Sequence, residues 1–237
     1  TRGFDGLAER LAGYKSQGAR FAKWRAVFMI GEGIPSYRAM AVNADALARY
    51  AAICQELDIV PIVEPEVLMD GNHDLAHCAS VTEAVLETVF YYLHQHHVAL
   101  EGMLLKPNMV MPGADCMVQA TAAEIGAATL RSLRRTVPAA MPGIHFLSGG
   151  QSDEAATANL NAMNIGAGQK PWQLTFSYGR ALQAPALRAW HGEPANREAG
   201  QQALIKRARL NSLARQGGIR FPWKLIDSCR RVAMRCG

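Results

Sequence analysis

Lys106 is the residue whose setting most suggests chemistry. It follows two leucines in an apolar run and precedes Pro107, a residue that ends regular strand pairing. Burial of an ammonium group is costly and lowers a lysine pKa, and the neutral amine that results is the form that attacks a carbonyl carbon. The alternative is a structural lysine that extends its charge to solvent or pairs with Glu64 or Glu66. The local sequence leaves both roles open.

The sequence contains a pair of carboxylates, Glu64 and Glu66, and a pair of cations, Lys23 and Arg25. The two members of each pair are two residues apart. Glu64 and Glu66 therefore point to one face of a strand. Two carboxylates close together raise the pKa of one of them, and that carboxyl group can then donate and accept protons near neutral pH. Lys23 and Arg25 share a face of an earlier strand, opposite to Trp24, and need an anion such as Glu64 or a substrate phosphate. The alternatives are carboxylates that pair separately with lysine or arginine, and cations that are solvated at the surface.

Two glycine-containing turns suit a phosphate group. Ser148, Gly149 and Gly150 join a strand to the start of a helix, an arrangement that presents backbone N–H groups to an anion. Gly179 and Arg180 end the following strand, and an arginine can bind phosphate through two nitrogen atoms. Together the turns predict a phosphate site at the ends of adjacent strands.

A group of histidines raises a zinc site as an alternative to the lysine chemistry. His73 and His77 have the i, i+4 spacing of a helical zinc pair, and Cys78 is adjacent. However, residues 70–72 have the composition of a turn, and Ser80 with Glu83 predicts a helix that starts only after both histidines. We therefore expect no metal here.

Five apolar runs alternate with amphipathic stretches, a pattern that predicts βα units. The predicted strands are residues 21–28, 59–67, 102–110, 144–149 and 173–178. Helix starts are predicted after Asn43, at Ser80, and at Thr121 with Glu124, and a final helix covers residues 196–215. Such a parallel sheet is either doubly wound or a closed (β/α)8 barrel, and both folds place functional groups at the carboxyl ends of strands.

The composition and charge of the chain argue against a membrane or nucleic-acid partner. With 237 residues and 49% hydrophobic content, the chain fits one domain, and it has no apolar stretch long enough to span a membrane. Residues 218–237 carry four of the five net positive charges, so a nucleic-acid surface is poorly supported. Five scattered cysteines favour a reducing compartment over disulfides.

Residues 98–108, which read VALEGMLLKPN, resemble the active-site signature of class I fructose-bisphosphate aldolases. Residues 21–25, 61–66, 146–152 and 174–180 are similar to further segments of that family, in family order, and the likeness covers residues 1–217. The resemblance implies an α/β fold of the (β/α)8 TIM-barrel family. The five strands resemble the fourth to eighth, while the first three, with an aspartate and a lysine of the family's site, have no counterpart.

The resemblance also implies a reaction and its residues. Lys106 would form an imine with fructose 1,6-bisphosphate, a phosphorylated ketose, and Glu64 would transfer protons, with Lys23 and Glu66 assisting. The products are dihydroxyacetone phosphate and glyceraldehyde 3-phosphate, and no metal or cofactor is required. The C1 phosphate would be held at Ser148, Gly149, Gly150, Gly179 and Arg180, and Arg25 would lie toward the other phosphate.

The sequence and the resemblance also predict the domain bounds, the oligomeric state and the compartment of the chain. Residues 1–217 are predicted to be a partial barrel and 218–237 a separate basic and apolar tail, which lacks the family's terminal tyrosine. The family implies a homotetramer, with no nucleic-acid or membrane partner. Cytoplasm is the expected compartment, with a plastid as the alternative. A catalytically inactive truncated aldolase that acts as a binding or scaffold protein is the alternative function.

Overall fold

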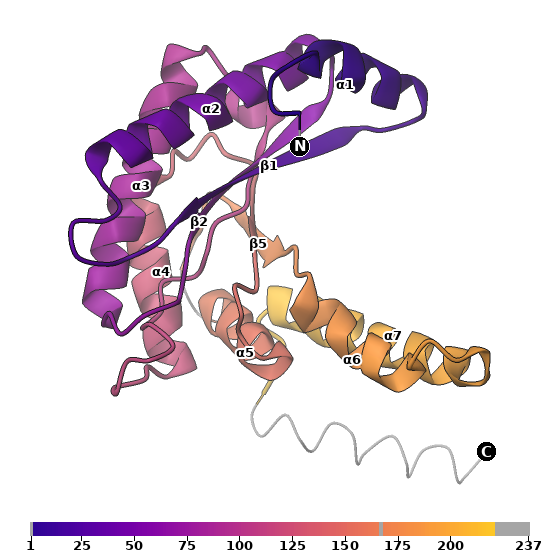
Figure 1. Cartoon of the computed structure of the whole chain (residues 1–237). Coiled ribbons are helices and arrows are strands. Elements are labelled where there is room, and N and C mark those ends of the chain that lie inside the picture. Colours follow the sequence, from indigo (N-terminus) through magenta and orange to yellow (C-terminus); the bar gives the residue numbers. More distant parts are fainter. Residues whose placement is uncertain (1, 166–167, 221–237) are drawn as a thin grey trace, which may run out of the picture.

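The fold is built around one five-stranded parallel sheet (Figure 1). The computed structural model describes residues 2–165 and 168–220. The elements in chain order are α1 Leu7–Ser16, β1 Phe21–Phe28, α2 Tyr37–Glu56, β2 Val60–Val67, α3 Leu75–Gln95, β3 Leu104–Leu105, α4 Ala122–Thr136, β4 Gly143–Phe146, α5 Asp153–Asn164, β5 Gln173–Phe176, α6 Arg180–Trp190 and α7 Arg197–Arg215. Short 3-10 helices cover Leu100–Gly102 and Pro194–Asn196. The five predicted βα strands are confirmed, in the order β1-β2-β3-β4-β5.

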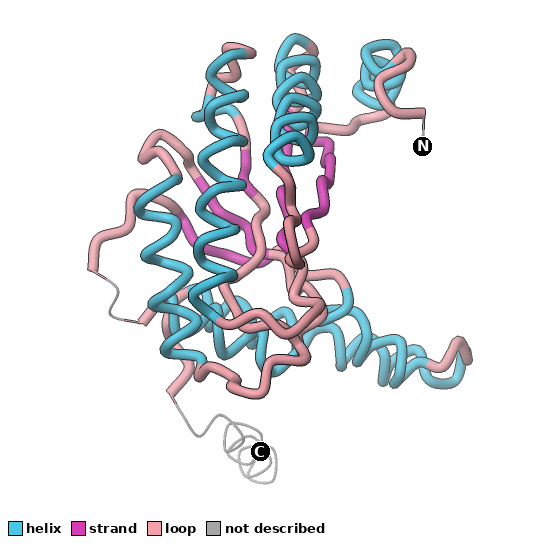
Figure 2. The backbone as a smooth tube through the Cα atoms, turned by 60° about the vertical axis from the view of Figure 1, so that its left-hand side comes forward, coloured by secondary structure: helices cyan, strands magenta, loops and turns pink. Residues whose placement is uncertain are grey.

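The helices α2 to α5 form one layer against one face of the sheet. Successive helices of this layer contact one another, and Figure 2 shows them side by side with the strands behind. On β1, Ala26 and Phe28 are buried and Trp24 lies near Tyr50 of α2, whereas Lys23 and Arg25 occupy the opposite face. A doubly wound sheet would have helices on both faces. The arrangement is therefore part of a (β/α) barrel, and the doubly wound alternative is wrong.

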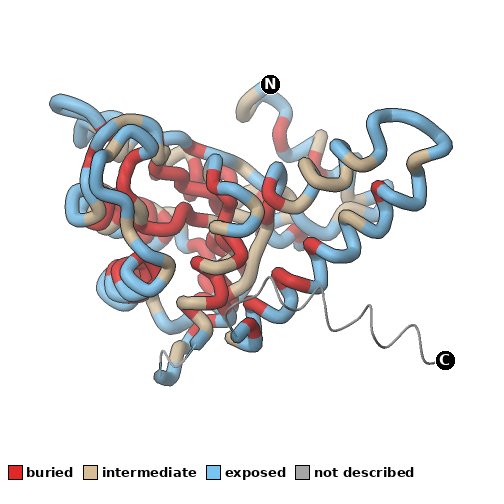
Figure 3. Tube along the Cα trace, turned by 90° about the horizontal axis from the view of Figure 1, so that it is seen from below, coloured by how far each residue is buried: buried red, intermediate tan, exposed pale blue. Residues whose placement is uncertain are grey.

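The hydrophobic core lies between the sheet and its helix layer, where Figure 3 shows the buried segments gathered. Alternating strand positions fill this layer, among them Val63, Leu105 and Ile144, all fully buried. In the described part of the chain, no helix is long and apolar enough to cross a membrane. Helices α6 and α7 pack on each other and extend away from the sheet (Figure 1).

Strand β3 is much shorter than the predicted 102–110. The 3-10 helix precedes it, and Pro107 has no N–H to donate. The chain nevertheless stays beside its neighbours: Lys106 N donates to Val63 O at 2.8 Å, and Leu147 N donates to Pro107 O at 3.1 Å. These bonds hold Lys106 at the carboxyl end of the sheet.

Helix α2 begins seven positions before the predicted Ala44, because Ser36 rather than Asn43 caps it. The Ser36 side chain accepts a hydrogen bond from Ala39 N at 3.2 Å. Asn43 lies inside the helix, where its side-chain nitrogen donates to Ala39 O at 2.8 Å. The predicted start at Asn43 is wrong because its side chain is satisfied within the helix.

Helix α3 also begins earlier than predicted. Asp74 caps it by accepting a hydrogen bond from His77 N at 2.7 Å, so Ser80 lies within the helix. Glu83, the expected partner of Ser80, instead accepts hydrogen bonds from Ser132 and Arg135 of α4. The predicted capping box is wrong because a tertiary contact takes its carboxylate.

The capping box of α4 is confirmed. Thr121 Oγ1 accepts from Glu124 N at 3.3 Å, and Glu124 Oε2 accepts from Thr121 N at 2.8 Å. These contacts with Thr121, first the backbone and then the hydroxyl, lower the pKa of the Glu124 carboxyl. The N-terminus of α4 is thus defined by local sequence alone.

We expect Thr121→Ala to lower the free energy of unfolding by about 1 kcal/mol, because the first turn of α4 loses its cap. The melting temperature should fall by roughly 2 to 4 °C for a domain of this size. Circular dichroism during heating measures it. Thr121→Ser, which keeps the hydroxyl, is the matched control. An equal loss in both variants would contradict a capping role.

Candidate active site

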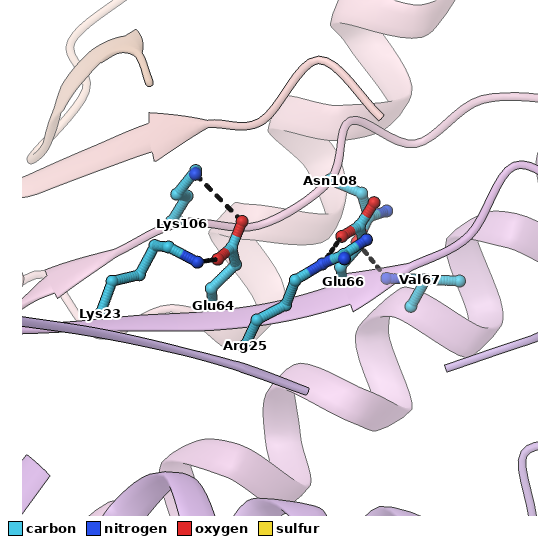
Figure 4. Close-up of polar contacts among 7 residues, drawn as sticks. All are labelled: Lys23, Arg25, Glu64, Glu66, Val67, Lys106 and Asn108. Carbon is cyan, nitrogen blue, oxygen red and sulfur yellow. Dashed lines mark hydrogen bonds and ion pairs between the residues drawn. The ribbon is translucent and has the colours of Figure 1, made fainter. Parts of the chain in front are cut away.

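Glu64 lies between two lysines on the sheet face that carries no helix layer (Figure 4). Its Oε2 accepts a hydrogen bond from Lys23 Nζ, and its Oε1 is 3.0 Å from Lys106 Nζ. The Glu64 residue is 3% exposed and the Lys106 side chain only 12%. The proposed nucleophile therefore sits in a largely dehydrated site in direct contact with a carboxylate.

Strand register explains this meeting of residues distant in sequence. In the parallel pairing of β1 with β2, Lys23 is aligned with Ile62 and Arg25 with Glu64. Each cation then reaches the carboxylate two positions further along β2, since these side chains share one face. Lys106 continues β3 beside Val63, which brings its amine to Glu64 from the other side.

Arg25 and Glu66 form a second ion pair beside the first. Arg25 Nε donates to Glu66 Oε2, and Glu66 is buried while nearly half of the Arg25 side chain is exposed. This hydrogen bond raises the pKa of Arg25, burial opposes the change, and the charges of Glu66 and Glu64 add to it. Glu64 thus pairs with two lysines and Glu66 with Arg25, the separate pairing that the sequence left as an alternative to a coupled carboxylate pair.

Asn108 supports the site and was not singled out from the sequence. Its Oδ1 accepts from Val67 N at 3.0 Å (Figure 4). Its Nδ2 lies 3.1 Å from Thr82 Oγ1 and 3.1 Å from Met109 O. It therefore joins the chain after Lys106 to the end of β2 and to α3. The sequence shows only an asparagine in an apolar run directly after Pro107, and this pattern does not identify its partners.

We expect Asn108→Leu to lower the free energy of unfolding by about 1 to 3 kcal/mol, because it leaves Val67 N and the Thr82 hydroxyl buried without this partner. Urea titration followed by tryptophan fluorescence measures the loss. Asn72→Leu, which makes the same change at an exposed position, is the matched control and should alter the free energy of unfolding little. If Asn108→Leu were as stable as wild type, Asn108 would not fasten these strand ends.

The glycine turn after β4 lies against the end of β2. Gly149 and Gly150 have φ values of 51° and 85°, which side chains with a Cβ rarely adopt. A Cβ at Gly149 would come within 2.9 Å of Leu147 Cδ1 and 3.9 Å of Glu66 Oε1. With Ser148 buried at its start, the turn approaches the carboxylate cluster.

Gly179 and Arg180 follow the neighbouring strand. Strands β4 and β5 are paired up to Phe146 and Phe176, and Ser177 N donates to Phe146 O at 2.9 Å. The Ser148 turn and Arg180 therefore leave the same edge of the sheet. Arg180 is exposed at the first position of α6. That both groups bind one phosphate stays a prediction.

The histidine cluster differs from its predicted setting, because α3 begins before His77. His73 precedes the helix and is buried, and its ring centroid lies 6.4 Å from that of His77. Burial, and then the proximity of His77, lowers the pKa of His73. Within residues 2–165 and 168–220, no group of three or more metal-binding side chains is placed to hold an ion.

Comparisons with known proteins agree on one family. A family model described as fructose-bisphosphate aldolase class-I matches residues 1–224. Fructose-bisphosphate aldolase C of Homo sapiens is 59% identical over 92% of the chain, and aldolase B of Homo sapiens is 58% identical over 91%. A solved structure of the Plasmodium falciparum aldolase, in complex with TRAP and a small-molecule inhibitor, has a TM-score of 0.89 and 52% identity over 91% of the chain. The chain spans about 60% of the length of these curated relatives and 62% of the solved chain.

Proposed function

Because the chain belongs to the class I fructose-bisphosphate aldolase family, we propose that it cleaves fructose 1,6-bisphosphate reversibly through an imine on Lys106. The products are dihydroxyacetone phosphate and glyceraldehyde 3-phosphate. The observation that carries the proposal is the 3.0 Å separation between Lys106 Nζ and Glu64 Oε1. A base in direct contact with a mostly covered lysine supports activation of the amine as a nucleophile.

Imine formation begins with a proton transfer. Glu64 accepts a proton from the Lys106 ammonium, and the neutral amine attacks the C2 carbonyl carbon of the open-chain ketose to give a carbinolamine. Glu64 then returns a proton to the C2 hydroxyl, which leaves as water. The product is a protonated imine between C2 and Lys106 Nζ. Lys23, which donates to the other Glu64 oxygen, keeps this carboxylate oriented.

The protonated imine then accepts the electron pair of the C3–C4 bond. Glu64 removes the proton of the C4 hydroxyl, C4 becomes the aldehyde carbon of glyceraldehyde 3-phosphate, and an enamine remains on Lys106. The proton that Glu64 took from the C4 hydroxyl is transferred to C3, which restores the imine and the Glu64 carboxylate. Water then attacks C2, so hydrolysis releases dihydroxyacetone phosphate and returns the free lysine.

Phosphate groups fix the substrate at both ends of the site. The backbone N–H groups of the Ser148-Gly149-Gly150 turn, with Gly179 and the Arg180 guanidinium, hold the C1 phosphate. Arg25 serves the other phosphate, which competes with Glu66 for its guanidinium. The nearness of Gly149 to Glu66 supports this layout, because the turn and the carboxylates then share one end of the sheet.

Glu66 assists without touching the reacting carbons. Its carboxylate holds Arg25, and that pair stands next to Glu64 on the same strand face.

The free cysteines of the described chain, Cys54, Cys78 and Cys116, suit the reducing cytoplasm, where we place the activity. By family resemblance the assembly is a homotetramer, which light scattering of the purified chain measures.

The test of function is direct product formation. Purified chain is incubated with fructose 1,6-bisphosphate, and both triose phosphates are quantified by mass spectrometry. Equal amounts of the two products, formed in proportion to protein concentration, are expected. The alternative is a catalytically inactive binding or scaffold protein, which would yield neither product while remaining folded by circular dichroism.

A further inference from the structure

Arg207 of α7 is a buried cation that binds the first turn of α5. The residue is only 4% exposed, although arginine is rarely buried without partners. Its Nη2 donates to the main-chain oxygen of Asp153 and to Thr157 Oγ1, and its Nε lies 3.4 Å from Asp153 Oδ2. Arg207 thus contacts both the backbone and the carboxylate of the residue that begins α5.

The contacts of Arg207 belong to a buried polar cluster between α5 and α7. Thr157 Oγ1 lies 2.7 Å from Asn211 Oδ1, and Asn211, one turn after Arg207, is fully buried. Buried polar groups of this kind are costly unless paired, and removal of one partner leaves the others desolvated. The cluster therefore specifies how α7 docks on α5 (Figure 1).

The first turn of α5 continues directly from the glycine turn. Gln151 N donates to Ser148 O at 2.9 Å, and Ser152 caps the helix by accepting from Ala155 N at 3.0 Å. The Gln151 side chain accepts from Asn159 Nδ2 at 2.8 Å. Because these bonds join the turn to α5 without a flexible linker, the position of α5 sets the position of the turn.

Gly179 and Arg180, the second part of the proposed phosphate site, are attached to the same helix, α5. Tyr178 is buried and its hydroxyl donates to Ala156 O at 2.8 Å. Gly179 and Arg180 follow it immediately. Both parts of the proposed phosphate site are thus attached to the first turn of α5, the segment that Arg207 also contacts.

We propose that Arg207 is a positioning residue that holds the Ser148–Gly150 turn and Arg180 in the geometry that binds the C1 phosphate. This inference rests on the proposed function, because it names what places the phosphate site. Arg207 itself touches neither substrate nor Lys106. Its loss acts through displacement of α5, and small displacements of binding groups have large effects on affinity.

The experiment compares two ketones on the full chain. Dihydroxyacetone phosphate and dihydroxyacetone share a carbonyl and differ in the phosphate, and borohydride trapping at Lys106 gives a half-saturating concentration for each. For Arg207→Met we expect that concentration to rise on the order of tenfold or more for the phosphate ester and to stay unchanged for dihydroxyacetone. Arg207→Lys, which keeps the charge, should give a smaller rise.

Matched controls make the result decisive. Arg209→Met removes an exposed arginine from the same helix and should leave both concentrations unchanged. A rise of equal size for both ketones in Arg207→Met, or no rise for either, would overturn the proposal. If Arg207→Met does not fold, Arg207→Lys decides by the same comparison.

Failure of the proposed function has a separate signature. Wild-type chain that is trapped by neither ketone lacks the imine chemistry, whatever Arg207 does. Titration calorimetry with inorganic phosphate then tests Arg207 alone. Weaker phosphate binding by roughly tenfold in Arg207→Met, with none in Arg209→Met, supports the proposal, and equal binding by wild type and Arg207→Met overturns it.

Discussion

Lys106→Met is expected to abolish imine formation and to lower the rate of fructose 1,6-bisphosphate cleavage by about 10⁵-fold or more, as loss of a covalent nucleophile does in other enzymes. Methionine keeps much of the length and apolar character of the lysine stem, so the buried setting remains filled. The variant leaves Glu64 with Lys23 as its remaining ion-pair partner. Product formation and borohydride trapping measure the effect.

Lys170→Met is the matched control for that substitution. Lys170 is also partly buried, and burial, followed by the charge of Arg134, lowers its pKa. Its amine lies 3.0 Å from Met163 O, away from the carboxylates. We expect the control to keep its activity. A Lys106→Met chain that still cleaves within about tenfold of wild type would show that another group carries the reaction.

Glu64→Gln is expected to have the second largest effect, a fall in cleavage rate of roughly 10² to 10⁴-fold. Glutamine keeps the shape, but its single oxygen can accept from only one of the two lysines. It neither accepts the proton of the Lys106 ammonium nor returns one to the leaving hydroxyl. It also leaves two cations without their shared counter-charge. Steady-state kinetics measure the fall, and trapping with dihydroxyacetone phosphate should slow in parallel.

Glu66→Gln serves as the comparison for Glu64→Gln. It removes the same charge two residues away, from a carboxylate paired with Arg25 rather than with Lys106. A smaller loss of rate is expected, together with weaker binding of the bisphosphate as Arg25 is released. Urea titration of both variants separates lost chemistry from lost stability. A larger rate loss in Glu66→Gln would reverse the assignment of the proton-transferring residue.

Sequence periodicity predicted the sheet well because burial imposes it residue by residue. The bounds of β1 were predicted correctly, since period-two alternation over residues 21–28 reflects one face toward the helices. Helix starts were less predictable. Asn43, Ser80 and Thr121 all have cap chemistry, yet only Thr121 caps, because Ser36 and Asp74 stand at the observed starts of the other two helices.

The site was predictable where parallel register governs it. Residues two apart on β1 and on β2 had to meet across the sheet, and the ion pairs of Lys23 and Arg25 follow from that register. The parallel register did not predict the contacts of Asn108 and Arg207. Their partners are 41 and 54 residues away and depend on how helices and strand ends dock, which no local pattern specifies.

The domain division stays a prediction. Residues 221–237, most of the tail predicted at 218–237, lie outside the described residues. Ile219, at the end of the described chain, is buried and exchanges two hydrogen bonds of 3.0 Å with the side chain of Asn161. The chain thus remains attached to α5 two residues beyond position 217.

The position of the covalent adduct shows directly whether Lys106 is the residue that forms the imine. Purified chain is incubated with dihydroxyacetone phosphate, reduced with borohydride, digested and mapped by mass spectrometry. We expect one added triose phosphate on the peptide that contains Lys106, and none when borohydride is omitted. A folded chain with no added mass, or with the mass on Lys23 instead of Lys106, would contradict this expectation.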